Sequence, residues 1–314
     1  MEIIADKYIP FLQGLLEPYA RIAYLEPEDI TPESVRNADA LLIRTRTKCN
    51  ADLLRNSKVQ FIATATIGFD HIDTCYCDEH NIEWTNAPGC NAQGVCDYVE
   101  EALASINRPH ATLGIVGVGH VGSLVAEMSQ RKGYTILLND PPKHIGVNLE
   151  DIARRADIIT FHTPLTTTGN YPTYHLCDEP FLDKCKPDAV IINAARGGVV
   201  DEKALLKKLQ NPDSQLSAVI DTWEGEPHLN KALLKEVRIG TYHIAGYTLR
   251  GKINATNLCL AALCTHFALP ILQIPKKALP LQAETGTGWI REVDRQLRQQ
   301  PDNFETLRET YKLR

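Results

Sequence analysis

A run of glycines directly after a strand-like segment constrains this chain more than any other feature. The apolar segment Leu113–Val116 predicts a buried strand, and the sequence GVGHVG, residues 117–122, follows at once. Residues 123–132 then have a helical pattern, and a second apolar segment, 135–138, leads to Asp140. A strand, a GxGxxG turn, a helix and a second strand ending in an acid are typical of the dinucleotide-binding βαβ unit. The alternative is a tight turn that binds no ligand.

Each glycine of this turn has a separate expected role. Gly117 permits the tight turn, Gly119 lets a pyrophosphate approach the backbone, and Gly122 lets the helix pack close to the sheet. Asp140 would accept hydrogen bonds from the ribose hydroxyls and repel a 2′-phosphate, so NAD is favoured over NADP. The candidate cofactor-binding residues in this unit are Gly117, Gly119, His120, Val121, Gly122 and Asp140.

Apolar runs alternate with helical patterns along most of the chain. Such runs are typical of strands buried on both faces of a parallel sheet. We predict strands at Glu2–Ala5, Ala40–Ile43, Phe61–Ala65, Trp84–Ala87, Ile158–Phe161, Ala189–Ile192 and Ala218–Ile220, and helices at Asn91–Ile106 and Ile253–Phe267, with a further helix entered at Pro10–Leu16. The pattern predicts an α/β protein with two Rossmann-like or flavodoxin-like lobes, each built on a parallel sheet.

The length of 314 residues suggests two domains. We expect the cofactor lobe, residues 94–248, to be inserted into a substrate-binding lobe made of residues 1–93 and 249–283. Residues 284–314 are charged and helical apart from a break at 301–303, and we expect them to form a short C-terminal tail.

Composition narrows the class of protein. The net charge of −6 argues against binding nucleic acid through bulk charge. No apolar run approaches the ~20 residues that a membrane span needs. The nine cysteines show no paired metal-site spacing, so we expect reduced thiols, no metal and a cytoplasmic protein.

Three polar residues follow predicted strands of the cofactor lobe. They are Arg196 in the segment NAARGG, Glu226 in WEGEP and His243 in HIAGY. These residue types suit the oxidation of a 2-hydroxy acid. A guanidinium binds the carboxylate through two parallel hydrogen bonds, an imidazole takes the hydroxyl proton, and a carboxylate behind the imidazole stabilises its charged form.

The order of these motifs resembles the D-isomer-specific 2-hydroxyacid dehydrogenases. GxGxxG is followed by NAxRG, WExEP and HxxG, and the resemblance covers most of the chain. It implies that Arg196, Glu226 and His243 are catalytic. It also implies further cofactor-binding positions at Thr163, Ala194, Ala195, Arg196, Asp221 and Gly246.

A second set of residues points to the substrate. Arg44, Arg46 and Lys48 follow the predicted strand at 40–43, with Thr45 and Thr47 between them. On an extended segment the cations and the threonines would face opposite sides, so we expect a turn or bulge here. A cationic cluster suits a phosphorylated substrate, and the alternative is a solvated basic edge.

Four segments, residues 44–50, 64–71, 87–92 and 243–252, resemble one member of the same family that oxidises a phosphorylated 2-hydroxy acid. That resemblance implies substrate contacts at Thr45, Thr66 and Tyr247. The full set of candidate substrate-binding residues is Arg44, Thr45, Lys48, Thr66, Gly68 and Tyr247.

The expectation is thus an NAD-dependent oxidoreductase that acts on a small phosphorylated 2-hydroxy acid. Two alternatives stay open. One is a related dehydrogenase with another substrate, such as 3-phosphoglycerate. The other is a non-catalytic, NAD-sensing binding protein. We also expect a homodimer, formed through helices 91–106 and 253–267 and the C-terminal tail.

Overall fold

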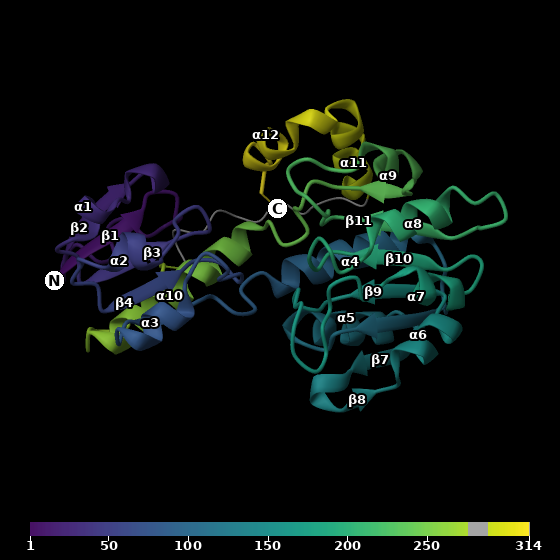
Figure 1. Ribbon diagram of the computed structural model, residues 1–314, viewed down its shortest axis with the longest axis horizontal. Coiled ribbons are helices and arrows are strands. Elements are labelled where there is room, and N and C mark those ends of the chain that lie inside the picture. Colours follow the sequence, from purple (N-terminus) through teal and green to yellow (C-terminus); the bar gives the residue numbers. More distant parts are fainter. Residues whose placement is uncertain (276–287, 314) are drawn as a thin grey trace. The chain divides into compact units, whose positions relative to one another are not determined.

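The structure is a computed structural model that describes residues 1–275 and 288–313. The chain forms two compact units. The first comprises Met1–Asn91 and residues 248–275, and the second comprises Ala92–Tyr247 and residues 288–313 (Figure 1). The expected α/β architecture, with one lobe inserted into the other, is confirmed. Within the described ranges, no helix is long and apolar enough to cross a membrane.

The first unit contains a five-stranded parallel sheet with the order β2-β1-β3-β4-β5, which is the flavodoxin-like order. Four of these strands match predicted ones, whereas β2 lies in a segment for which no strand was predicted. The strands are β1 (Glu2–Asp6), β2 (Arg21–Leu25), β3 (Ala40–Ile43), β4 (Phe61–Thr64) and β5 (Glu83–Thr85).

Alternate residues of these strands are buried on opposite faces of the sheet. Leu41 packs in a cluster with residues of three short helices, whereas Leu42 packs in a second cluster with residues of a long helix. The short helices are α1 (Pro32–Val35), α2 (Ala51–Leu54) and α3 (Thr74–Glu79), and the long one is α10 (Leu249–His266). Both faces are covered, which explains why the strands read as continuous apolar runs.

The second unit contains a seven-stranded sheet with the order β12-β11-β10-β9-β6-β7-β8, parallel except for β8. Without β12, this is the Rossmann order. Because β6 lies between β7 and β9, the topological switch point is at the carboxyl ends of β6 and β9. The strands are β6 (Thr112–Val116), β7 (Thr135–Asp140), β8 (Ile145–Gly146), β9 (Ile158–Phe161), β10 (Val190–Asn193), β11 (Ser217–Ile220) and β12 (Ile239–Gly240).

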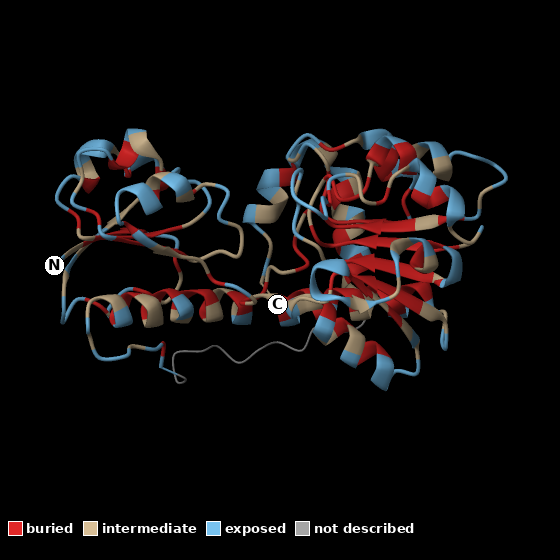
Figure 2. Ribbon diagram, turned by 60° about the horizontal axis from the view of Figure 1, so that its bottom comes forward, coloured by how far each residue is buried: buried red, intermediate tan, exposed pale blue. Residues whose placement is uncertain are grey.

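Helices cover both faces of this sheet, and its strands β6, β9, β10 and β11 are almost entirely buried (Figure 2). Helices α4 and α5 pack against each other, while α6, α7, α8 and α9 form a consecutive row. Their bounds are α4 (Ala92–Ile106), α5 (His120–Arg131), α6 (Leu149–Arg155), α7 (Glu179–Lys184), α8 (Glu202–Leu209) and α9 (Lys231–Glu236). Helix α5 begins three residues before the predicted start, directly at the glycine turn.

The C-terminal helices α11 (Trp289–Gln299) and α12 (Phe304–Glu309) pack on the second unit. Asp294 accepts a hydrogen bond from the backbone amide of Gly240 at 2.7 Å, and Arg298 donates to the carbonyl of Val237 at 2.8 Å. These helices therefore extend the cofactor unit, whereas the sequence predicts a tail of its own. The remaining residues of the predicted substrate lobe and tail, 276–287 and 314, lie outside the described residues.

The segment Pro10–Leu16 contains turns, and the helix predicted there is wrong. Phe11 and Gly14 both have positive φ angles, of 60° and 88°, which an α-helix cannot accommodate. Leu12 and Leu16 are nevertheless fully buried against the sheet. The apolar spacing that suggests a helix reflects the burial of a compact loop.

Candidate active site

The glycine turn between β6 and α5 brings two backbone segments very close together. Gly117 has a φ of +91°, which residues with a side chain rarely adopt. A Cβ atom on Gly122 would lie 1.9 Å from the carbonyl oxygen of Gly117, so only glycine fits. A Cβ on Gly119 would meet no heavy atom of the described residues within 4 Å. The surface of the turn therefore leaves room for a pyrophosphate.

Asp140 lies at the end of β7, beside this turn. Its side chain is largely buried, and Oδ2 accepts a hydrogen bond from the backbone amide of Val118 at 2.8 Å. The ammonium of Lys143 lies 3.7 Å from the same oxygen. An acid at this position can accept hydrogen bonds from the hydroxyls of an adenosine ribose.

Thr163 follows β9, on the other side of the switch point. Its Cγ2 would lie 3.0 Å from a Cβ atom placed on Gly117, so the two loops are neighbours. The Thr163 hydroxyl is buried and has no hydrogen-bond partner among the described residues. Buried hydroxyls are normally satisfied. This hydroxyl and the open space over Gly119 together fit a bound dinucleotide.

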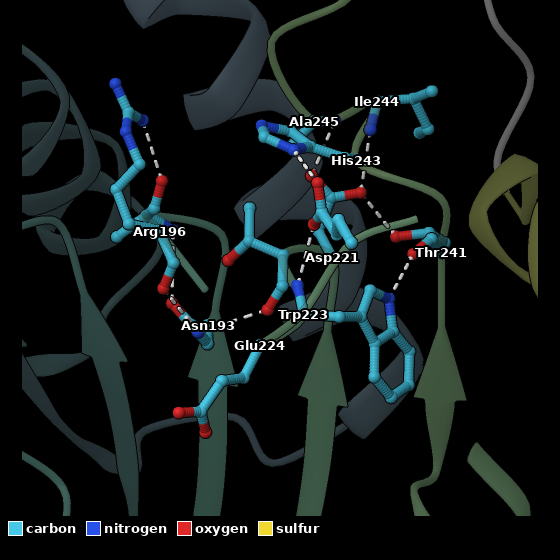
Figure 3. Close-up of polar contacts among 12 residues, drawn as sticks. Asn193, Arg196, Asp221, Trp223, Glu224, Thr241, His243, Ile244 and Ala245 are labelled. Carbon is cyan, nitrogen blue, oxygen red and sulfur yellow. Dashed lines mark hydrogen bonds and ion pairs between the residues drawn. The ribbon is translucent and has the colours of Figure 1, made fainter. Parts of the chain in front are cut away.

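Arg196 lies in a tight loop after β10. The side-chain amide of Asn193 donates to the Arg196 carbonyl at 3.1 Å, and its oxygen accepts from the Ala195 amide at 3.2 Å. A Cβ atom on Gly197 would lie 2.0 Å from the carbonyl oxygen of Trp223. The backbones of these two loops are therefore in close contact. The guanidinium of Arg196 donates to the Ala195 carbonyl at 2.8 Å (Figure 3).

Asp221, fully buried after β11, organises the loop that carries His243. Its Oδ1 accepts hydrogen bonds from the Thr241 hydroxyl at 2.6 Å and the Ile244 amide at 2.9 Å, and its Oδ2 accepts from the Ala245 amide at 2.9 Å (Figure 3). His243 itself has a φ of +57°, an uncommon backbone conformation. These hydrogen bonds on both sides hold His243 in that conformation. Gly246 and Tyr247 continue the same loop.

Glu226 and His243 form a hydrogen-bonded pair. Oε2 of Glu226 lies 2.8 Å from Nδ1 of His243, and Oε1 accepts from the Trp223 amide at 2.8 Å. Burial by itself raises the pKa of the Glu226 carboxyl. The hydrogen bond and charge of His243, the Trp223 amide and the charge of Arg308 outweigh burial and lower that pKa below its usual value. Glu226 is therefore a carboxylate at neutral pH.

In the first unit, the segment after β3 turns as the sequence predicts, because the Thr47 amide donates to the Arg44 carbonyl at 3.3 Å. The predicted cluster of three cations is only partly present. Nε of Arg44 lies 3.1 Å from a carboxylate oxygen of the fully buried Asp6. Arg46 and Lys48 instead line a pocket, together with Thr47. Burial of the Asp6 carboxylate requires a partner, which explains why Arg44 turns towards it.

Thr66 and Gly68 lie in the loop after β4, the strand next to β3. The Thr66 hydroxyl donates to the Gly68 carbonyl at 2.9 Å and lies 2.7 Å from the Thr64 hydroxyl. Thr45 is exposed at the end of the neighbouring strand. The candidate substrate residues of this unit thus follow two adjacent parallel strands.

The sequence model of the family "D-isomer specific 2-hydroxyacid dehydrogenase, NAD binding domain" matches residues 93–245. The chain is 48% identical over 282 residues to a protein of Bacteroides fragilis named erythronate-4-phosphate dehydrogenase, covering 86% of this chain and 81% of that one. The chain belongs to the D-isomer-specific 2-hydroxyacid dehydrogenases. A second relative of the same name, from Bacteroides thetaiotaomicron, is 44% identical. That match covers 100% of this chain and 97% of the relative.

Solved structures of this family share the fold. The NAD⁺-bound 3-phosphoglycerate dehydrogenase of Entamoeba histolytica superposes with a TM-score of 0.71 at 22% identity, covering 88% of this chain and 99% of that one. A D-lactate dehydrogenase from Aquifex aeolicus superposes with a TM-score of 0.67 at 22% identity, covering 85% and 96%. The chain is thus an NAD-dependent dehydrogenase with the family's two α/β lobes.

Among the histidines of this dehydrogenase, His162 also lies at the carboxyl edge of the second sheet. Burial lowers the pKa of His162 to about 3, so its imidazole stays neutral. One ring nitrogen lies 3.1 Å from the Thr160 hydroxyl, and Nδ1 has no partner among the described residues. Within residues 1–275 and 288–313, no hydrogen bond joins this ring to a carboxylate. Unlike His162, His243 is paired with a carboxylate, that of Glu226, which makes His243 the stronger acid–base candidate of the two.

Sequence reasoning missed two contributors to this site. The Tyr98 hydroxyl donates at 2.8 Å to the Thr241 hydroxyl, whose own proton goes to Asp221, and this connects α4 to the hydrogen bonds around Asp221. Arg308 on α12 lies close enough to Glu226 to lower its pKa. Both are far in sequence from the motifs, and no residue spacing connects them with the site.

Proposed function

We propose that this dehydrogenase oxidises 4-phospho-D-erythronate to 3-hydroxy-2-oxo-4-phosphobutanoate with NAD, a step in the biosynthesis of pyridoxal phosphate. The observation that carries this proposal is the 48% identity to a relative named for this substrate, over 81% of that relative's length. The intact Arg196, Glu226 and His243 support catalysis over a binding role without chemistry.

In this proposal His243 is the general base. Oxidation removes a hydride from C2 and a proton from the C2 hydroxyl, and the imidazole takes that proton at Nε2 because Nδ1 bonds to Glu226. The Glu226 carboxylate fixes the ring orientation and stabilises the imidazolium that forms. Arg196 binds the substrate carboxylate and orients C2. NAD, when bound, accepts the hydride.

We propose that NAD is held at the carboxyl edge of the second sheet. The glycine turn would contact the pyrophosphate and Asp140 the adenosine ribose. The proposed cofactor-binding residues are Gly117, Gly119, His120, Val121, Gly122, Asp140, Thr163, Ala194, Ala195, Arg196, Asp221 and Gly246. No step of the reaction is assigned to a metal.

The first unit is proposed as the substrate-binding lobe. Its candidate residues follow β3 and β4, where the carboxyl ends of parallel strands meet. The proposed substrate-binding residues are Arg44, Thr45, Lys48, Thr66 and Gly68 in this unit and Tyr247 in the second. The ion pair with Asp6 fixes the position of the Arg44 side chain after β3. We further propose that the protein works as a homodimer in the cytoplasm.

The test is to incubate the purified protein with NAD and 4-phospho-D-erythronate, and to identify the product by mass spectrometry. We expect reduced nicotinamide and the 2-oxo product in equal amounts. Turnover of 3-phosphoglycerate but not of 4-phospho-D-erythronate would overturn the substrate assignment and keep the family. NAD binding without turnover of any 2-hydroxy acid would favour the non-catalytic alternative.

A further inference from the structure

Arg308 is a charged residue at the catalytic pair that none of the sequence motifs includes. Its guanidinium carbon lies 5.6 Å from the centre of the Tyr247 ring. Tyr247 is four residues after His243 in the same loop, and it is one of the proposed substrate contacts. The C-terminal helix α12 therefore brings a cation to the loop that carries the general base.

The packing of α12 fixes the position of this arginine. Phe304, at the start of the helix, is 1% exposed, and Leu307 and Tyr311 pack against the core of the second unit. The Tyr311 ring meets the Tyr242 ring edge-on, with 6.0 Å between their centres. Arg308 thus lies on a helix that Phe304, Leu307 and Tyr311 pack against the second unit.

The hydrogen-bonding capacity of Arg308 is incompletely used. Its Nε is buried, and no acceptor for it lies within hydrogen-bond distance among residues 1–275 and 288–313. The charge of Arg308 acts on the Glu226 carboxylate, but the two oxygens of that carboxylate bond to Trp223 and His243. A buried guanidinium donor without an acceptor is costly, and an anionic ligand would satisfy it.

We propose that Arg308 is a substrate-binding residue whose guanidinium binds the phosphate group of the 2-hydroxy acid beside Tyr247. This inference rests on the proposed function, since it requires a phosphorylated substrate. A guanidinium offers a planar pair of donors that matches phosphate oxygens. The carboxylate at the other end of the substrate is already assigned to Arg196, which leaves the phosphate as the anion for Arg308.

The test compares Arg308→Met and Arg308→Lys with the matched control Arg295→Met. The control removes an exposed arginine of α11 that forms an ion pair with Glu292. For each variant, kcat and KM are measured for 4-phospho-D-erythronate, together with the KM for NAD and the pH profile of kcat. We expect Arg308→Met to raise the substrate KM about 10- to 100-fold, the usual effect of losing a hydrogen bond between charged groups. The KM for NAD should stay unchanged, and any shift of the acidic limb of kcat, from loss of the Arg308 charge near Glu226, should be small beside the rise in substrate KM.

The lysine variant keeps a positive charge and a long side chain, so it should recover part of the lost affinity and remain folded. If the wild-type enzyme turns over 4-phospho-D-erythronate and Arg308→Met has the same substrate KM, this inference is overturned while the proposed function stands. A displaced acidic limb with an unchanged KM would also overturn it, because Arg308 would then act through Glu226. If the wild-type protein does not turn over the phosphorylated acid at all, the proposed function fails, and this inference fails with it.

Discussion

Oε2 of Glu226 lies 2.8 Å from Nδ1 of His243, while the other oxygen of the same carboxylate accepts the Trp223 amide at 2.8 Å. The amide fixes the carboxylate, and the carboxylate fixes the imidazole ring. Because Nδ1 is engaged, Nε2 is the nitrogen left to take the substrate proton. The pair therefore assigns one chemical role to each nitrogen of His243.

Replacing this carboxylate with an amide should shift the pH dependence of catalysis. A carboxylate partner stabilises the imidazolium, so Glu226→Gln should move the acidic limb of kcat/KM to lower pH. It should also lower kcat, because the imidazolium formed in the reaction loses its counter-charge. The pH–rate profiles of the wild type and the variant give the measurement. An acidic limb that does not move would contradict the role of Glu226.

Asp221→Asn should loosen the loop that carries His243. The carboxylate accepts three hydrogen bonds, and an amide nitrogen in place of Oδ2 would face the Ala245 amide. We expect a loss of about 3 kcal/mol in the free energy of unfolding, with a fall in kcat. Asp213→Asn, at an exposed position, is the matched control. Unfolding titrations that give equal stability for Asp221→Asn and the wild type would argue against this account.

Two glycines of the same turn should respond differently to alanine. In Gly122→Ala the new Cβ would lie 1.9 Å from a backbone oxygen, so the second unit should lose about 2–3 kcal/mol of stability. In Gly119→Ala the Cβ meets no described atom within 4 Å, so the fold should persist. The methyl group would instead occupy the space proposed for the pyrophosphate and raise the KM for NAD. Equal melting temperatures for Gly122→Ala and Gly119→Ala would contradict this division of roles. So would an unchanged KM for NAD in Gly119→Ala.

Glu202 should make stability fall as pH rises. Burial raises the pKa of the Glu202 carboxyl to about 7. The charges of Glu224, Glu226 and Asp201 also raise this pKa, whereas the hydrogen bond from the Glu224 amide lowers it. In the unfolded chain its pKa is about 4.3. Its contribution is therefore fully present below about pH 4.3 and is lost as pH rises through about 7, a change of about 4 kcal/mol.

Glu202→Gln keeps an oxygen for the Glu224 amide, which lies 2.6 Å from the carboxylate. It should remove this decrease, so the variant should be more stable than the wild type at about pH 8 and similar at about pH 4.5. The exposed Glu179→Gln is the control. Denaturant titrations at both pH values give the free energies of unfolding. If the free energy of unfolding changes equally with pH in Glu202→Gln and the wild type, the raised pKa of Glu202 is contradicted.

Local patterns predicted the elements whose structure depends on local chemistry. The strand at Ile158–Phe161 has the predicted bounds, because a strand buried on both faces is a continuous apolar run. The GxGxxG turn was predicted because each glycine has a steric reason that sequence spacing reveals. For the segment Pro10–Leu16 the sequence predicts a helix wrongly, because buried leucines in a loop have the same spacing as those of a helix face.

The parts that sequence could not predict depend on contacts between distant residues. The sequence predicts that Arg44 joins a cationic cluster, but the buried Asp6, 38 residues earlier, pairs with it. Arg308 meets Tyr247 only because α12 folds back onto the second unit. Neither contact has a motif, since each is set by the packing of separate elements.

The identity of the substrate is tested most directly by comparing kcat/KM for 4-phospho-D-erythronate, 3-phosphoglycerate and D-lactate, each with NAD. The comparison uses the wild type and His243→Ala. We predict that 4-phospho-D-erythronate has the highest kcat/KM. We also predict that His243→Ala lowers its kcat by about 10²- to 10⁴-fold, the usual contribution of a general base. A higher kcat/KM for either of the other acids, or full activity without His243, would contradict the account.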